Sequence, residues 1–165
     1  MKTTKRSKSR EAQVERMRKV WPVLKPLTVF ADSQVAWIGP VRGFQMSYKV
    51  VVVWNPAKTI SPLVFVRQPT IAPRPGADWI DIPHLLYDPG SPKDSALCLF
   101  DPEQNEWRSS MWISDTIVPW ASEWLHHYEL WHFDGVWRGA NAPGPISIGA
   151  GMNRSETRLS TRKSS

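Results

Sequence analysis

The chain has 165 residues, and 41% of them are hydrophobic, which is enough for one domain with its own core and short for two. Its net charge of +6 is concentrated at the two ends, with +6 in residues 1–19 and +3 in residues 151–165. Residues 20–150 contain nine basic and twelve acidic residues and therefore carry −3. The expected folded part is mildly acidic, which argues against a nucleic-acid-binding surface on it.

The sequence also lacks the features of a disulfide-rich, a membrane-spanning or a secreted protein. A single cysteine excludes an internal disulfide framework. No run approaches the roughly 18–20 apolar residues of a membrane span, and the basic start of the chain lacks the apolar region of a signal peptide. We therefore expect a soluble cytoplasmic protein, in a reducing compartment where a lone thiol stays available for chemistry.

The first half of the chain predicts a helix followed by an antiparallel meander. Apolar residues at helical spacing predict a helix over 11–21. Short connections and β-branched residues then predict three antiparallel strands, over 34–42, 46–54 and 62–68. We expect a bend or bulge at Gly39-Pro40, inside the first of these strands.

A long irregular segment and a strong helix make up the second half. Residues 69–97 are rich in Pro and Gly turn signals, and a loop of this length within a domain is more often functional than idle. A wide apolar stripe predicts a helix over 116–131, with Thr116 as its N-cap and Gly135 as its stop. The expected divisions of the chain are a disordered basic N-terminus, a folded domain and a flexible basic tail, over 1–10, 11–145 and 146–165.

Cys98 follows the irregular segment, within Leu97-Cys98-Leu99. Taken alone, a free cysteine between two leucines is most often a small buried hydrophobe. The end of a long loop favours a second interpretation, because nucleophiles are commonly placed on loops held by rigid elements. A cysteine thiolate suits transient acyl transfer, since a thioester keeps its reactivity toward a second nucleophile. Cys98 is therefore the first candidate for chemistry.

The histidines allow two other interpretations of Cys98. The chain has four of them, at His84, His126, His127 and His132. A zinc site would need about four convergent ligands, and one thiol without paired-cysteine spacing falls short of that pattern, so no metal is expected. His84 could act as the base of a protease-like pair with Cys98, but no glutamine or Gly-rich oxyanion signature accompanies it.

The tryptophans also have two interpretations. Those between 107 and 137 could stack on the bases of single-stranded nucleic acid. The helical register of Trp120, Trp124 and Trp131 favours packing in the core instead. Few basic residues lie among them, so a nucleic-acid partner is not expected for this region.

The order of these features resembles that of ubiquitin-conjugating (E2) enzymes. In that family an N-terminal helix, an antiparallel meander and a Pro-rich segment with a histidine precede a catalytic Cys in an I/L-C-L context, and a Trp and a helix follow it. The matching positions here are His84, Cys98 and Trp107, and the resemblance covers roughly residues 10–140. It implies an α/β (α+β) protein with the ubiquitin-conjugating fold, and it implies no cofactor.

Several segments are similar to bacterial E2-like proteins of CBASS anti-phage defence, which signals with cyclic oligonucleotides. They include Ile82-Pro83-His84, Thr116-Ile117-Val118-Pro119-Trp120-Ala121 and Gly135-Val136-Trp137-Arg138-Gly139. The resemblance implies that Cys98 attacks the activated C-terminus of a partner nucleotidyltransferase, a cGAS-like cyclic-oligonucleotide synthase, and passes the acyl group to an amine. We expect a stand-alone form of this E2, with a separate activating enzyme as a candidate second partner and no membrane partner.

Supporting residues around Cys98 follow from the same interpretation. Backbone N–H groups near 98–101 would stabilise the oxyanion. Asp101 and Asp115 could orient an incoming lysine, although surface carboxylates usually have no such role. Trp107 would support the site.

His84 departs from the pattern of the family. Eukaryotic E2 enzymes place Pro-Asn after the histidine, and the Asn supports the oxyanion. Here Leu85-Leu86 follows His84, so no side-chain amide can be given that role. We expect His84 to hold the loop, more than to act as an acid or base.

Two alternatives to the acyl carrier stay open. One is a non-catalytic binding module with the same fold, which chaperones or activates the nucleotidyltransferase. The other is a basic-tailed nucleic-acid binder, whose binding would depend on the two ends of the chain and on salt.

Overall fold

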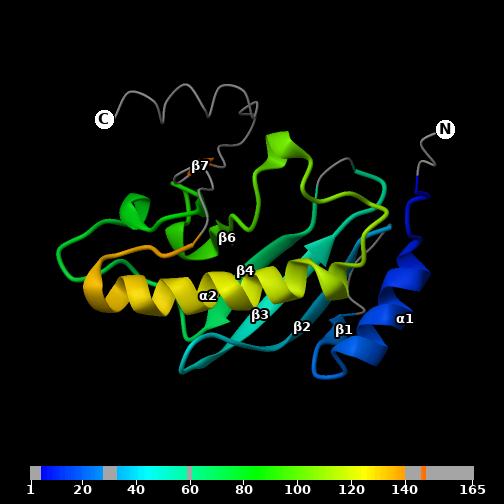
Figure 1. Ribbon diagram of the computed structural model, residues 1–165, viewed down its shortest axis with the longest axis horizontal. Helices are drawn as coiled ribbons and strands as arrows, with labels where there is room; N and C mark the ends of the chain where they lie inside the picture. The colour runs from blue at the N-terminus through cyan, green and yellow to red at the C-terminus, as the bar shows by residue number, and fades with distance from the viewer. Residues whose placement is uncertain (1–4, 28–32, 59–60, 140–145, 148–165) are drawn as a thin grey trace.

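The computed structural model describes residues 5–27, 33–58, 61–139 and 146–147, and within them two α-helices accompany one sheet (Figure 1). The helices and strands are α1 (Arg10–Val20), β1 (Lys25–Leu27), β2 (Val35–Arg42), β3 (Ser47–Trp54), β4 (Leu63–Gln68), β5 (Leu85–Tyr87), β6 (Ala96–Leu97), α2 (Ile117–Asp134) and β7 (Ile146–Ser147). The strand order is β1-β2-β3-β4-β6-β5-β7, and neighbours are antiparallel except β5 and β7. The predicted α+β class, with an N-terminal helix, an antiparallel sheet and a later helix, is confirmed.

The predicted meander is present as β2, β3 and β4. Each strand begins one residue after its predicted start and ends at the predicted residue. Burial alternates along β3 and β4, so one face of the sheet points into the core. The buried residues of these two strands are Tyr48, Val50, Val52, Trp54, Val64 and Val66. In Figure 1, α2 runs across this part of the sheet, and α1 lies at its β1 end.

Gly39 and Pro40 do not interrupt β2. They pair with Val50 and Lys49 in an unbroken register, and the register shift lies between β3 and β4 instead, at Lys49/Val50. Gly39 is needed for close packing, because a Cβ there would lie 2.3 Å from the carbonyl oxygen of Val23. The predicted bulge at this dipeptide is therefore wrong, and the alternative of a bend stays a prediction.

Helix α2 ends three residues beyond its predicted end, at Asp134. Thr116 occupies the N-cap position as predicted, but its hydroxyl donates to the carbonyl oxygen of Trp112 (2.7 Å) and does not cap the helix. Gly135 ends the helix as predicted, with φ of 79° and its N–H donated to the carbonyl oxygen of Trp131. Within the described residues, no helix is long and apolar enough to cross a membrane.

The side chain of Gln13 fastens α1 to the segment before α2. Gln13 is buried, its Nε2 donates to the carbonyl oxygen of Met111 (2.8 Å), and its Oε1 accepts from the N–H of Ile113 (3.0 Å). A buried amide with both ends paired fixes the relative position of two segments. The start of α2 is thereby held at a fixed place over the sheet.

The described part of the basic N-terminus touches the domain. The hydroxyl of Ser9 accepts from the N–H of Ala12 and caps α1, and the N–H of Lys8 donates to the carbonyl oxygen of Ser109 (2.8 Å). Residues 1–4 lie outside the described residues. The expected disorder of this end and the domain boundaries stay predictions.

The irregular segment contains two short strands that the sequence did not predict. Strand β6 pairs with β5 through Leu85↔Leu97 and Leu86↔Ala96, and Ala96 also pairs with Phe65 of β4. Cys98 therefore follows directly on a strand of the main sheet. Strand β7, at the start of the expected tail, pairs with β5, and residues 148–165 of that tail lie outside the described residues.

Candidate active site

The backbone carbonyl of His84 fixes the position of Cys98. It accepts a hydrogen bond from the N–H of Cys98 (2.9 Å) and a second from Nε1 of Trp124 on α2 (2.8 Å). His84 adopts φ of 52°, a conformation that is uncommon for residues other than glycine. One carbonyl thus joins the sheet, the cysteine segment and the helix, which holds Cys98 in a defined place.

A cleft of about 430 Å³ opens beside Cys98. It lies between the end of the sheet, the loop that follows β6, helix α2 and the segment after α2. The residues that line it are His84, Cys98, Leu99, Phe100, Glu106, Trp120, Glu123, Trp124, His127, Trp137 and Gly139. Its volume is in the range of sites that bind small molecules or a few residues of a peptide.

The thiol of Cys98 is buried and protonated at neutral pH. Cys98 is 4% exposed, and its Sγ lies 3.6 Å from the carbonyl oxygen of Phe100. The pKa of the thiol is raised to about 12, chiefly by burial and further by the charges of Asp101 and Glu106. In this state the nucleophilic thiolate is a minor species.

The ring of His84 lies at the cleft but is packed against an aromatic neighbour. His84 is 9% exposed, and its ring centroid is 5.1 Å from that of Trp137. Its backbone makes the contact to Cys98 described above. The expected role of His84 in holding the loop and any role of its ring in catalysis both stay predictions.

Three other predicted site residues, Asp101, Trp107 and Asp115, do not line the cleft. Asp101 caps the turn Pro102–Gln104, and its carboxylate accepts from the N–H of Glu103 (3.0 Å). The ring of Trp107 packs edge-on against Trp54, with 6.4 Å between the centroids.

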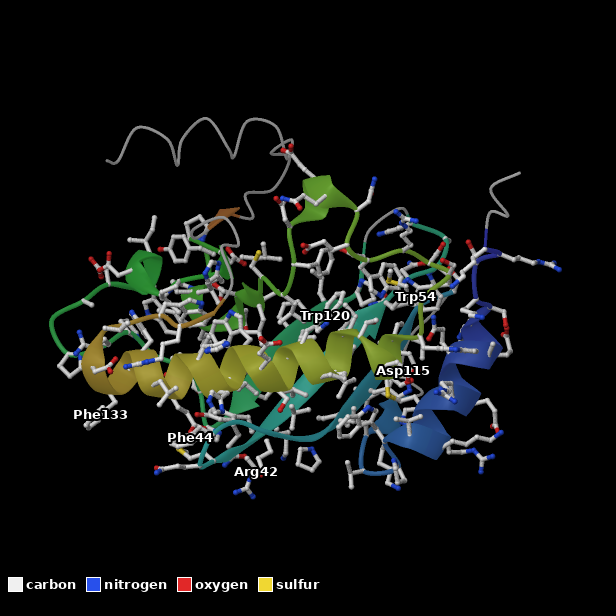
Figure 2. The ribbon with its side chains drawn as sticks, in the orientation of Figure 1. Arg42, Phe44, Trp54, Asp115, Trp120 and Phe133 are labelled. Carbon is white, nitrogen blue, oxygen red and sulfur yellow. The ribbon has the colours of Figure 1, made fainter. Side chains whose placement is uncertain are left out.

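Asp115 forms an ion pair with Arg16 of α1. Its carboxylate lies 2.9 Å from Nη2 of Arg16, and this hydrogen bond is the main cause that lowers the pKa of Asp115. In Figure 2, Asp115 lies at the end of α2 nearest α1, and Trp120 lies further along the helix. The structure therefore places Asp115 apart from the cleft that Trp120 lines.

Three ionisable residues of the cleft were not predicted to lie there, and one of them, His127, was considered only as a zinc ligand. Glu123 and His127 come from α2, and Glu106 from the loop after β6. The signal was present in part, because positions 120, 123, 124 and 127 share one side of a helix. Their importance depends on the loop after Cys98 lying across that side, which periodicity does not reveal.

The remaining histidines do not gather around Cys98. His126 packs against Phe44, with 4.9 Å between the ring centroids, and His132 lies against Tyr128 and Trp131. Among the described residues, no group of three or more His, Cys, Asp or Glu side chains could hold a metal ion. The absence of a metal in the working protein stays a prediction.

Comparison with known proteins places the chain in a family. Residues 13–145 match the family described as Type II CBASS E2 protein, which is the greater part of the chain. A comparison with curated proteins gives no match. The match confirms the resemblance to CBASS E2-like proteins and supports a role in CBASS defence together with other CBASS components. The chain belongs to the Type II CBASS E2 protein family.

Proposed function

We propose that Cys98 accepts the C-terminal acyl group of the CBASS nucleotidyltransferase as a thioester and passes it to an amine. The observation that carries this proposal is the place of Cys98, a lone cysteine fixed at the wall of a cleft of about 430 Å³. The order of helix, antiparallel sheet, cysteine segment and helix supports assignment of the ubiquitin-conjugating fold. A separate activating enzyme would supply the activated carboxyl group, in the cytoplasm.

The acyl transfer would begin when the activated C-terminus enters the cleft. Sulfur of Cys98 attacks the carbonyl carbon, the bond from that carbon to the activating group breaks as the thioester forms, and the thiol proton passes to the departing activating group. The N–H of Cys98 is donated to His84 and that of Asp101 to Glu106. The amides of Leu99 and Phe100 are therefore the candidates for stabilising the oxyanion.

Burial of the thiol gives the free protein a low reactivity. Because the pKa of Cys98 lies near 12, the sulfur is shielded from oxidants and stray electrophiles until a donor is held against it. The activation of the carboxyl group and its position in the cleft must then supply the driving force.

The test is a trapping experiment with the synthase and its activating enzyme. Cys98→Ser should give a cross-linked species that survives thiol reductants, because an oxygen ester replaces the thioester. Wild type should give a reductant-sensitive species, and Cys98→Ala should give none. The same species from wild type and Cys98→Ala would refute the proposal.

The burial of Cys98 also favours a second candidate function. A cysteine that only packs in a non-catalytic binding module would show the same low exposure of 4% and the same pKa, raised far above the working pH. That module would bind the synthase and chaperone or activate it. Full phage defence by Cys98→Ala, with loss of defence on changing residues of the cleft surface, would identify this function.

A further inference from the structure

Glu123 and His127 form an ionisable pair on the wall of the Cys98 cleft. They are one turn apart on α2, and Nε2 of His127 lies 3.6 Å from Oε1 of Glu123. The side chain of His127 is 17% exposed, whereas that of Glu123 is 66% exposed. The carboxylate can therefore meet an incoming molecule, while the imidazole is set more deeply beside it.

The orientation of the His127 ring is fixed by the segment after α2. The ring centroid of Trp137 lies 5.7 Å away, and a Cβ on Gly139 would lie 3.0 Å from Cδ2 of His127. Nδ1 of His127 is buried and has no hydrogen-bond partner among the described residues. The Nε2 edge, next to Glu123, is thus the part of the ring available for proton exchange with a molecule in the cleft.

The charge of the cleft favours a cation. Glu106 and Glu123 are its acidic residues, and among the described residues no lysine or arginine lines it. An ammonium group would be attracted by these carboxylates in a partly enclosed space, where charges are screened less than in bulk water. An amine that attacks a thioester must first lose a proton, and a histidine beside a carboxylate is suited to remove it.

We propose that Glu123 and His127 form the acceptor site for the second acyl transfer, and this inference rests on the proposed function of Cys98. Glu123 binds the ammonium group of the acceptor, and Nε2 of His127 removes one of its protons. The neutral amine attacks the thioester carbonyl, the carbon–sulfur bond breaks, and an amide forms. Of the two protons that the nitrogen loses, one ends on the Cys98 sulfur and the other passes to solvent.

The other titratable groups near His127 come from three parts of the chain. His126 and Glu123 belong to the same helix, His84 and Cys98 come from the β5–β6 side, and Glu106 comes from the loop after β6. His126 does not line the cleft; its ring packs against Phe44 and edge-on against His127, with 5.7 Å between the His126 and His127 centroids. It is therefore a matched control, a neighbouring histidine outside the cleft.

A single-turnover discharge assay tests the proposal. Cys98 is loaded with the synthase C-terminus, the activating enzyme is removed, and discharge to free L-lysine is followed between pH 6 and 9. We expect His127→Gln to load normally and to discharge on the order of 100-fold more slowly near neutral pH, with a deficit that shrinks toward pH 9 because more of the lysine amine is then already deprotonated. Glu123→Gln should discharge roughly tenfold more slowly, and His126→Gln should match wild type. Normal discharge by both His127→Gln and Glu123→Gln would overturn the acceptor site.

A binding measurement separates this inference from the proposed function. If wild type forms no thioester, the acyl-carrier function fails. NMR of the histidine rings, with lysine amide as the probe, then tests separately whether Glu123 and His127 bind an ammonium group. We expect the probe to shift the His127 signals more than those of His126, whose ring lies 5.7 Å from that of His127, and Glu123→Gln to reduce the shift. Norleucine amide, which keeps the α-amino group but lacks the side-chain ammonium group, should have a much smaller effect. A His127 signal that ignores lysine amide, or responds equally to norleucine amide, would overturn the site.

Discussion

Two regions of the molecule differ in how they are held. The meander of β2, β3 and β4 has long paired strands and an alternating buried face. The segment from Pro69 to Trp107, which carries Cys98, has strands of only two and three residues. It is fixed by single contacts, such as the N–H of Asp88 donated to Ser95 Oγ (2.9 Å) and Trp124 Nε1 donated to the His84 carbonyl.

The contacts of the two regions determine different properties of the protein. In the meander, stability comes from many apolar contacts, and each contributes a share of a large buried area. In the cysteine segment, the geometry of the cleft depends on a few polar contacts, so small changes there should affect chemistry more than folding. Substitutions in the two regions therefore test whether stability and chemistry depend on them to different degrees.

The largest expected effect concerns the reactivity of Cys98. With the pKa of the thiol near 12, alkylation by iodoacetamide in the folded protein should be slower at pH 8 by on the order of a thousandfold than in the unfolded chain. The folded rate should rise with pH up to pH 10 without levelling, and the unfolded rate should level off near pH 9. Intact-protein mass spectrometry measures both rates. A plateau below pH 9 in the folded protein would show that the cleft activates the thiol.

The next largest effect concerns the meander. Trp37 is 1% exposed on β2, and Trp37→Ala should lower the free energy of unfolding by about 3–5 kcal/mol, because it leaves a large cavity. Urea unfolding measures the change. Phe133→Ala is the control, because Phe133 is 86% exposed on α2 (Figure 2), and it should cost less than about 0.5 kcal/mol. Equal losses for the two variants would contradict the assignment of the core.

A smaller effect separates the backbone of His84 from its ring. Because φ at this position is 52°, His84→Val should lower the free energy of unfolding by about 1–2 kcal/mol relative to His84→Asn. The yield of the Cys98 thioester should fall more for His84→Val, since the valine disturbs the carbonyl that holds Cys98. Equal loss of thioester in both variants, at equal stability, would point to the imidazole ring instead.

The smallest effect concerns Asp115. Its pairing with Arg16 is partly exposed, so Asp115→Asn should cost less than about 1 kcal/mol at pH 7. Because the pairing lowers the pKa of Asp115, this difference from wild type should fade as the pH falls and the carboxylate becomes protonated. Thioester formation and discharge to lysine should be unchanged. Impaired discharge by a folded Asp115→Asn protein would restore the predicted role of Asp115 in orienting the acceptor.

The meander and α2 could be predicted from sequence because their patterns are local. Alternation along the strands and the stripe from Ile117 to Trp131 contain the signal in consecutive residues. Strands β5 and β6 are too short for a pattern, and Ala96 of β6 joins them to the main sheet by pairing with β4. Cys98 could be singled out as the lone thiol after a long loop. The cleft residues Glu123 and His127 could not, since their meaning depends on how the Cys98 loop and Trp137 lie over α2.

The most direct test of Cys98 as the acyl carrier is the mass of the peptide that contains it. Wild type would be expressed with the synthase and its activating enzyme, and digested without reductant at mildly acidic pH. The Cys98 peptide should gain the mass of the synthase C-terminal peptide less one water, and hydroxylamine should remove that mass. An unmodified Cys98 peptide, from cells in which the synthase still becomes conjugated in a manner that depends on this protein, would contradict the role of Cys98.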